Sequence, residues 1–99
     1  MKNRPSSRLT RRRPRSFVEW RTLRDWNRLP HREASVPGYL LRVAREEAGL
    51  TQAELARSLG VTQQAVAQAE RWQSNPTIAF VERWAAACNR RLEIRLPAA

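Results

Sequence analysis

The sequence predicts an all-α fold: a bundle of four to five helices with a basic N-terminal extension and a short C-terminal β-strand. Residues typical of helix caps and helix ends separate the predicted helices. Residues 91–96 alternate polar and apolar side chains with the period of two that is typical of a strand. Apolar residues recur every three or four positions, as on one face of a helix, in five segments: 16–26, 37–48, 51–59, 62–70 and 77–88.

Most of the net charge of +10 lies in the first 36 residues. They contain 11 basic and 3 acidic residues, net +8, whereas residues 37–99 contain 8 and 6, net +2. Such a balance favours polyanionic partners such as nucleic acid or an anionic membrane surface. Pro30 and Pro37 indicate a linker between this extension, residues 1–36, and the main domain, residues 37–99.

The first 15 residues are poor in apolar side chains and are expected to be disordered in isolation. They either follow a DNA groove and neutralise phosphates, or form a solvated tail that adds nonspecific affinity or solubility. If they bind DNA, deleting them should flatten the salt dependence of binding. The basic arm that we single out consists of Arg11, Arg12, Arg13 and Arg15.

Residues 16–26 are expected to form a short helix of their own. Ser16 and Glu19 have the spacing of a capping box, and apolar residues follow at roughly helical intervals. Trp20 and Trp26 either dock on the main domain or form an exposed face for a partner protein.

Two short helices joined by a tight turn are predicted over residues 51–59 and 62–70. Thr51 is the expected N-cap of the first helix, and Gly60 is placed to end it in a left-handed conformation. Thr62 is the expected N-cap of the second helix, which therefore starts almost at once. A connection this short, with a glycine and small packing residues, is typical of a helix-turn-helix.

The second of these helices carries a stripe of glutamines. On a helical wheel anchored at Val66, the side chains of Gln64, Gln68 and Arg71 point away from the core, and Gln63 lies in the exposed first turn. A glutamine amide can pair with N6 and N7 of adenine together, which contributes about 1 to 3 kcal/mol of base discrimination. Glutamine is also simply a good surface helix former, but three in this position favour base contact.

At these residues the chain resembles the lambdoid phage repressors and the wider XRE regulators, through the pattern T-Q-A-E-L-A-x-x-L-G-V-T-Q-Q-x-V-x-Q-x-E. The resemblance covers roughly residues 38–96 and implies a lambda-repressor-like helix-turn-helix fold. It implies that the second helix of the motif lies in the major groove and the first across the DNA backbone. It assigns base contacts to Gln63, Gln64 and Gln68 and a phosphate contact to Gln52. To the backbone contacts we add Thr62 and Arg71.

Two further positions bear on this resemblance. Glu70 matches a polar residue that the family usually keeps near the end of the recognition helix, where we expect a structural role. The family usually has a glycine just after that helix, whereas this chain has Trp72 and Gln73. The departure leaves Trp72 open to contact DNA backbone, core or a partner.

The alternating segment 91–96 ends the chain with an L-x-I-x-L pattern. An isolated strand is unstable, so Leu92, Ile94 and Leu96 should pair with another subunit or with a partner's sheet edge, or else lie back on their own helices. A helix-turn-helix followed by such an ending is similar to HigA-type and HipB-type antitoxins. That resemblance implies a repressor of its own operon that binds a toxin.

The sequence offers little for catalysis, because one histidine and one cysteine cannot make a structural zinc site without carboxylates and no catalytic motif is present. We expect no enzyme, metal or cofactor, no membrane span, and a cytoplasmic, nucleoid-associated homodimer on double-stranded operator DNA. The alternatives are a stand-alone repressor without a toxin and a protein-interaction adaptor.

Overall fold

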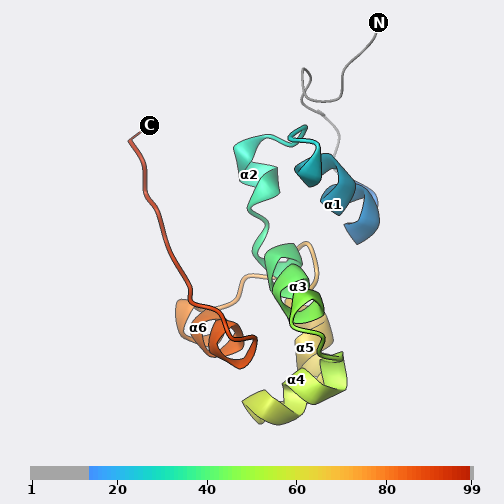
Figure 1. Cartoon of the computed structure of the whole chain (residues 1–99), viewed down its shortest axis with the longest axis vertical. Coiled ribbons are helices and arrows are strands. Elements are labelled where there is room, and N and C mark those ends of the chain that lie inside the picture. The colour runs from blue at the N-terminus through green and yellow to red at the C-terminus, as the bar shows by residue number, and fades with distance from the viewer. Residues whose placement is uncertain (1–13, 99) are drawn as a thin grey trace, which may run out of the picture. The chain divides into compact units, whose positions relative to one another are not determined.

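The computed structural model describes residues 14–98, and the chain divides into two compact units: unit 1, residues 1–36, and unit 2, residues 37–99. The all-α prediction is confirmed, but the predicted count of four to five helices is wrong. The described residues contain six helices (Figure 1): α1 Phe17–Asp25, α2 His31–Ala34, α3 Pro37–Glu47, α4 Gln52–Leu59, α5 Gln63–Ala69 and α6 Ile78–Ala87. The additional helix is the short α2, which lies in the segment expected to be a linker.

The predicted C-terminal strand is also wrong for this single chain. Residues 91–98 carry neither helix nor strand and run away from α6 as an extended segment (Figure 1). A strand needs a neighbouring strand to pair with its backbone groups, and every regular element in the described residues is a helix. The alternating pattern therefore correctly indicated an extended conformation. The chain is not a strand there because no second strand pairs with it in the described residues.

Unit 1 has a small centre of its own around Trp20. The Trp20 side chain is fully buried and stacks on Phe17, with the two ring centroids 5.8 Å apart. Its indole Nε1 donates a hydrogen bond of 2.8 Å to the backbone oxygen of Glu33 and so ties α1 to α2. Trp26, by contrast, is 49% exposed. The sequence led to the same prediction for both tryptophans, but Trp20 is buried and Trp26 is about half exposed.

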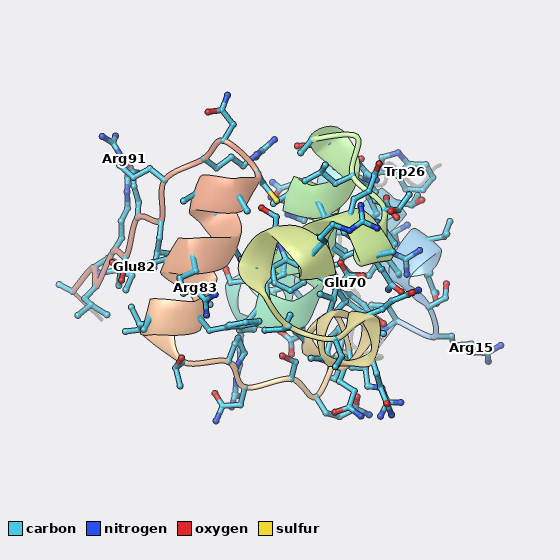
Figure 2. All side chains as sticks on the ribbon, turned by 90° about the horizontal axis from the view of Figure 1, so that it is seen from below. Arg15, Trp26, Glu70, Glu82, Arg83 and Arg91 are labelled. Atoms are coloured by element: carbon cyan, nitrogen blue, oxygen red, sulfur yellow. The ribbon has the colours of Figure 1, made fainter. Side chains whose placement is uncertain are left out.

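The start of α1 is capped by Ser16, whose Oγ accepts from the backbone N–H of Glu19 at 3.1 Å. The structure shows the Ser16 half of the expected capping box, and the Glu19 carboxylate accepts from the backbone N–H of Arg15 at 2.6 Å. The Arg15 side chain is exposed and projects from the unit (Figure 2). The other members of the basic arm lie outside the described residues: Arg11, Arg12 and Arg13.

Unit 2 packs α3, α4, α5 and α6 around one apolar core. Trp84 at its centre is fully buried, and its Nε1 donates to the backbone oxygen of Leu41 at 3.0 Å, which ties α6 to α3. Arg83 on the same helix donates to the backbone oxygen of Leu59 at the end of α4. The core consists of Leu41, Leu55, Ala56, Leu59, Val66, Trp84 and Cys88. This core fixes the crossing of α4 and α5 that carries the candidate site.

Candidate nucleic-acid interface

Local signals in the sequence set both ends of α4. Thr51 Oγ1 accepts from the backbone N–H of Glu54 at 3.0 Å, and the Glu54 carboxylate accepts from the backbone N–H of Thr51 at 2.8 Å. The hydrogen bond from the Thr51 backbone N–H, with a further one from the Thr51 side chain, stabilises the charged carboxylate and lowers the pKa of Glu54 below its ordinary value of 4.5. At the other end Gly60 has φ 72° and ψ 30°, a left-handed conformation that glycine adopts without steric cost. The chain can therefore turn at once into α5.

The turn leads into α5 through Thr62, whose Oγ1 accepts from the backbone N–H of Ala65 at 3.0 Å. Val66 is fully buried and anchors one face of the helix in the core. The side chains of Gln63, Gln64 and Gln68 are all exposed on the rest of its surface. The structure thus places the three candidate base-reading residues on one exposed helix that contains no charged side chain.

The residues assigned to the DNA backbone lie at the ends of this arrangement. The Thr62 hydroxyl is exposed and accepts the cap hydrogen bond, so its proton is available for a phosphate oxygen. Gln52 is the first residue of α4 and half-buried; its Nε2 donates to Glu70 Oε1 at 3.1 Å. This leaves one of its two amide N–H groups for a phosphate. Arg71 is exposed just beyond α5.

The sequence assigned no role to Arg45, which is central to this site. Arg45 is 8% exposed and Glu70 6% exposed, and together they make two hydrogen bonds: Nε to Oε2 at 2.5 Å and Nη2 to Oε1 at 3.0 Å. The hydrogen bond to the Glu70 carboxylate raises the pKa of Arg45, although burial opposes the shift. Arg45 Nη1 also donates to the backbone oxygen of Leu50 at 2.8 Å.

Glu70 therefore joins three helices, because it accepts from Arg45 of α3 and from Gln52 of α4 while it caps the end of α5. Figure 2 shows Glu70 among the helices of unit 2. The structural role expected for Glu70 is confirmed. Its partner Arg45 is 25 residues away in sequence. The one sequence signal for this pair is that Arg45, a charged residue, falls on the inward face of the helix predicted over residues 37–48.

The loop after α5 follows a path that the sequence left open. Trp72 is half-buried and makes an edge-to-face contact with Tyr39, with the ring centroids 5.6 Å apart. Gly38 lies so close to this loop that an added Cβ would be 1.9 Å from the backbone oxygen of Arg71. The loop after α5 can therefore pack closely against α3, because α3 has a glycine, Gly38, at the contact, although the loop itself has none.

A shallow polar depression of about 400 Å³ lies at this end of α5, lined by Gln68, Arg71, Gln73 and Ser74. Neither Gln73 nor Ser74 was expected from the sequence to contact DNA. Their position depends on the loop path, which local sequence signals do not determine. A guanidinium, an amide and a hydroxyl are suitable groups for a phosphate oxygen.

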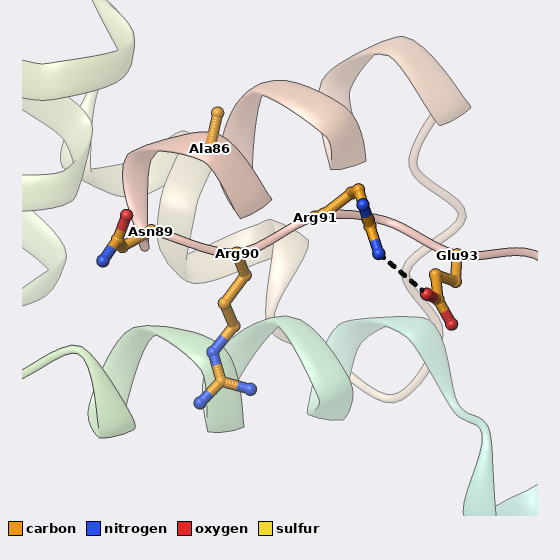
Figure 3. Close-up of a pocket in the computed structure, with 5 residues that line it drawn as sticks. All are labelled: Ala86, Asn89, Arg90, Arg91 and Glu93. Carbon is orange, nitrogen blue, oxygen red and sulfur yellow. Dashed lines mark hydrogen bonds and ion pairs between the residues drawn. The ribbon is translucent and has the colours of Figure 1, made fainter.

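A larger depression, of about 680 Å³, lies beyond the end of α6 and not beside α5 (Figure 3). Arg91 and Glu93 make an ion pair of 3.3 Å there, and Arg90 reaches Glu47 of α3 at 2.6 Å. These groups are exposed, and each of the two arginines has an acidic partner. Only the smaller depression of these two is lined by a residue of α5, Gln68.

The side chains of the predicted strand are not brought to α5. Leu92 is half-buried, Ile94 is 56% exposed and Leu96 is 91% exposed. Within residues 14–98, no cluster of three or more His, Cys, Asp and Glu side chains could bind a metal ion. The helices described here are too short or too polar for any of them to cross a membrane.

A comparison with known families agrees with this geometry. The helix-turn-helix family model matches residues 41–94, which is 54 of the 99 residues. The chain belongs to the helix-turn-helix family. The match is of the XRE type, so this helix-turn-helix protein is a DNA-binding regulator. Searches of curated proteins and of solved structures gave no significant match.

Proposed function

We propose that this helix-turn-helix protein is a sequence-specific repressor that reads operator DNA with α5. The observation that carries the proposal is the exposed glutamine stripe, Gln63, Gln64 and Gln68, on a helix whose opposite face is anchored by the buried Val66. A helix of this width fits the major groove, where amides can distinguish bases by paired donor and acceptor contacts. Repression follows from occupation of promoter DNA.

Backbone contacts orient α5 in the groove. Gln52, Thr62 and Arg71 supply an amide, a hydroxyl and a guanidinium at the two ends of the motif, and Gln73 and Ser74 extend the set beyond α5. These groups bind phosphates and carry no sequence information of their own. They fix the register in which the glutamines meet the bases.

In vitro selection from a random duplex library at about physiological salt tests this function. At that salt, binding to phosphates alone is weak, so enrichment requires base reading. We expect an enriched motif, and enrichment of an inverted repeat would also establish a two-fold dimer. Folded protein that enriches no motif would contradict the proposal and favour the adaptor role.

The C-terminal segment supplies the dimer contact in this proposal. Leu92, Ile94 and Leu96 share one face of an extended segment whose backbone is not paired within the described chain. Pairing of two copies across a two-fold axis would bury these side chains and satisfy the backbone groups. The two recognition helices would then meet half-sites spaced by one helical turn of DNA or a multiple of it.

The antitoxin role is the more specific form of the proposal. Its support is the exposed apolar C-terminal segment behind a helix-turn-helix, because such a segment can pair with a toxin's sheet edge as well as with a second copy. An adjacent reading frame encoding a small ribonuclease-like or kinase-like protein, together with its co-purification, would support the role. A chain that is purified from its native host without a partner and that still represses would favour a stand-alone repressor.

A further inference from the structure

The motif of α4 and α5 carries few positive charges: Arg57 lies on α4 and Arg71 just beyond α5, and both are exposed. Helix α5 contains no charged residue, and several arginines elsewhere in unit 2 are matched by acids. These pairs are Arg42 with Glu46 at 2.9 Å, Arg45 with Glu70 at 2.5 Å, Arg90 with Glu47 at 2.6 Å and Arg91 with Glu93 at 3.3 Å. Phosphate neutralisation normally provides a large part of DNA affinity, so cations elsewhere in the chain should add to it.

Unit 1 presents cations from a folded framework. Trp20 and Phe17 form its buried centre, and α2 is tied to α1 through the Trp20 indole. The exposed Arg24 guanidinium lies 5.5 Å from the centroid of the Trp20 ring, and the exposed Arg32 is on α2. Both side chains therefore project from helices that are fixed relative to each other.

The chain connects unit 1 to unit 2 beside the end of the recognition helix. An added Cβ on Gly38, near the start of α3, would meet the backbone oxygens of Arg71 at 1.9 Å and Ala69 at 3.0 Å, so α3 begins against the C-terminal end of α5. Only Ser35 and Val36 separate α2 from α3, which is about 7 Å of extended chain. A connection this short gives unit 1 a high effective concentration at DNA that is bound by α5.

We propose that unit 1 is a second DNA contact, in which Arg24 and Arg32 bind backbone phosphates of the duplex flanking each half-site. This proposal rests on the proposed function, because α5 must first place the chain on its operator. It adds to that function a division of roles, in which unit 1 contributes affinity for the DNA backbone and unit 2 reads the bases. Guanidinium groups held on helices suit phosphates on a regular duplex, which lie at fixed spacing.

Duplex length and charge neutralisation test the proposal together. Binding of the full chain is measured by fluorescence anisotropy, across a salt series, on the selected operator alone and on the operator with ten added base pairs on each side. We expect the longer duplex to steepen the salt dependence of wild-type binding, with the logarithmic slope changing by about 0.9 for each additional phosphate that the protein neutralises. In the Arg24→Gln/Arg32→Gln variant the two duplexes should give the same slope.

Two variants serve as matched controls, each checked for an unchanged circular dichroism spectrum. Arg91→Gln/Arg95→Gln removes the same charge from exposed positions in unit 2 and should keep the steeper slope on the longer duplex. Arg11→Gln/Arg12→Gln/Arg13→Gln neutralises the basic arm and should lower affinity on both duplexes while the difference in slope remains. Loss of that difference in either control would overturn the assignment to Arg24 and Arg32.

The outcomes separate this proposal from the function on which it rests. Specific binding of the operator without any effect of flanking DNA would overturn the role of unit 1 and leave the repressor proposal intact. Failure to bind any operator specifically would overturn both. An effect of flanking DNA that survives in Arg24→Gln/Arg32→Gln would show that the contact lies elsewhere in the chain.

Discussion

The helix-turn-helix and the C-terminal segment differ in where their hydrogen bonds come from. In α4 and α5 the backbone is satisfied within each helix, and the ends are closed by Thr51, Gly60 and Thr62. Residues 91–98 have a regular alternating pattern but no element to pair with in the described chain. Local sequence signals therefore set the helix ends in the first region, whereas the second region requires a partner to become a strand.

The first way to test this difference is to break one ion pair in each region. Glu70→Ala leaves the guanidinium of Arg45 buried without its carboxylate, because the Arg45 side chain is only 10% exposed. We expect a loss of about 3 to 5 kcal/mol in the free energy of unfolding, measured by urea denaturation. The side chain of Gln52 also loses its acceptor, so binding to operator DNA should weaken as well.

The matched variant is Glu93→Ala, which breaks the ion pair with Arg91 in the C-terminal segment. Both side chains of that pair are mostly exposed, at 85% and 59%, and Figure 2 shows Arg91 at the outside of unit 2. Exposed pairs contribute about 0 to 1 kcal/mol, so the free energy of unfolding should hardly change. Similar losses in the two variants would show that the Arg45–Glu70 pair does not stabilise the fold in the way that its burial indicates.

A second experiment concerns the partner that the C-terminal segment needs. Ile94→Asp places a charge on the apolar face of the segment, and a two-fold dimer would lose two buried isoleucines. We expect dimerisation to weaken by about 3 kcal/mol, measured by sedimentation equilibrium, while the circular dichroism spectrum stays the same. Unchanged association would exclude this face from the dimer contact, and the matched variant Arg95→Gln on the opposite face should have no effect.

The sequence predicted the features that depend on local interactions and missed those that depend on contacts between distant residues. The caps at Thr51 and Thr62 and the left-handed Gly60 depend on neighbours within a few residues, so the pattern predicted them. The bond from Glu70 to Arg45 and the approach of Gly38 to Arg71 join residues 25 or more positions apart. Such contacts depend on how helices cross, which periodicity does not specify.

A third experiment tests whether an exposed residue of α5 contributes to DNA binding without contributing to the stability of the fold. Gln64→Ala should weaken specific binding by about 1 to 3 kcal/mol and relax the preference at one base position in each half-site. Because Gln64 is exposed, the free energy of unfolding should stay nearly constant. Titrations on operator and on random duplex provide the measurement, and equal losses on both would show that Gln64 does not read bases.

The smallest expected effect comes from the capping box of α4 and appears only in acid. The pKa of Glu54 is lower in the folded chain than its ordinary value of 4.5, because the carboxylate accepts the backbone N–H of Thr51. Its contribution to stability is therefore present above pH 4.5 and is lost as the pH falls through the lower, folded value. The variant Glu54→Gln keeps a side-chain oxygen for the cap but does not titrate.

As the pH falls below 4.5, the wild type should lose unfolding free energy relative to this variant. Other carboxylates titrate in both proteins and cancel from the difference between the two. A difference that stays constant over this range would mean that the charge of Glu54 does not stabilise the start of α4.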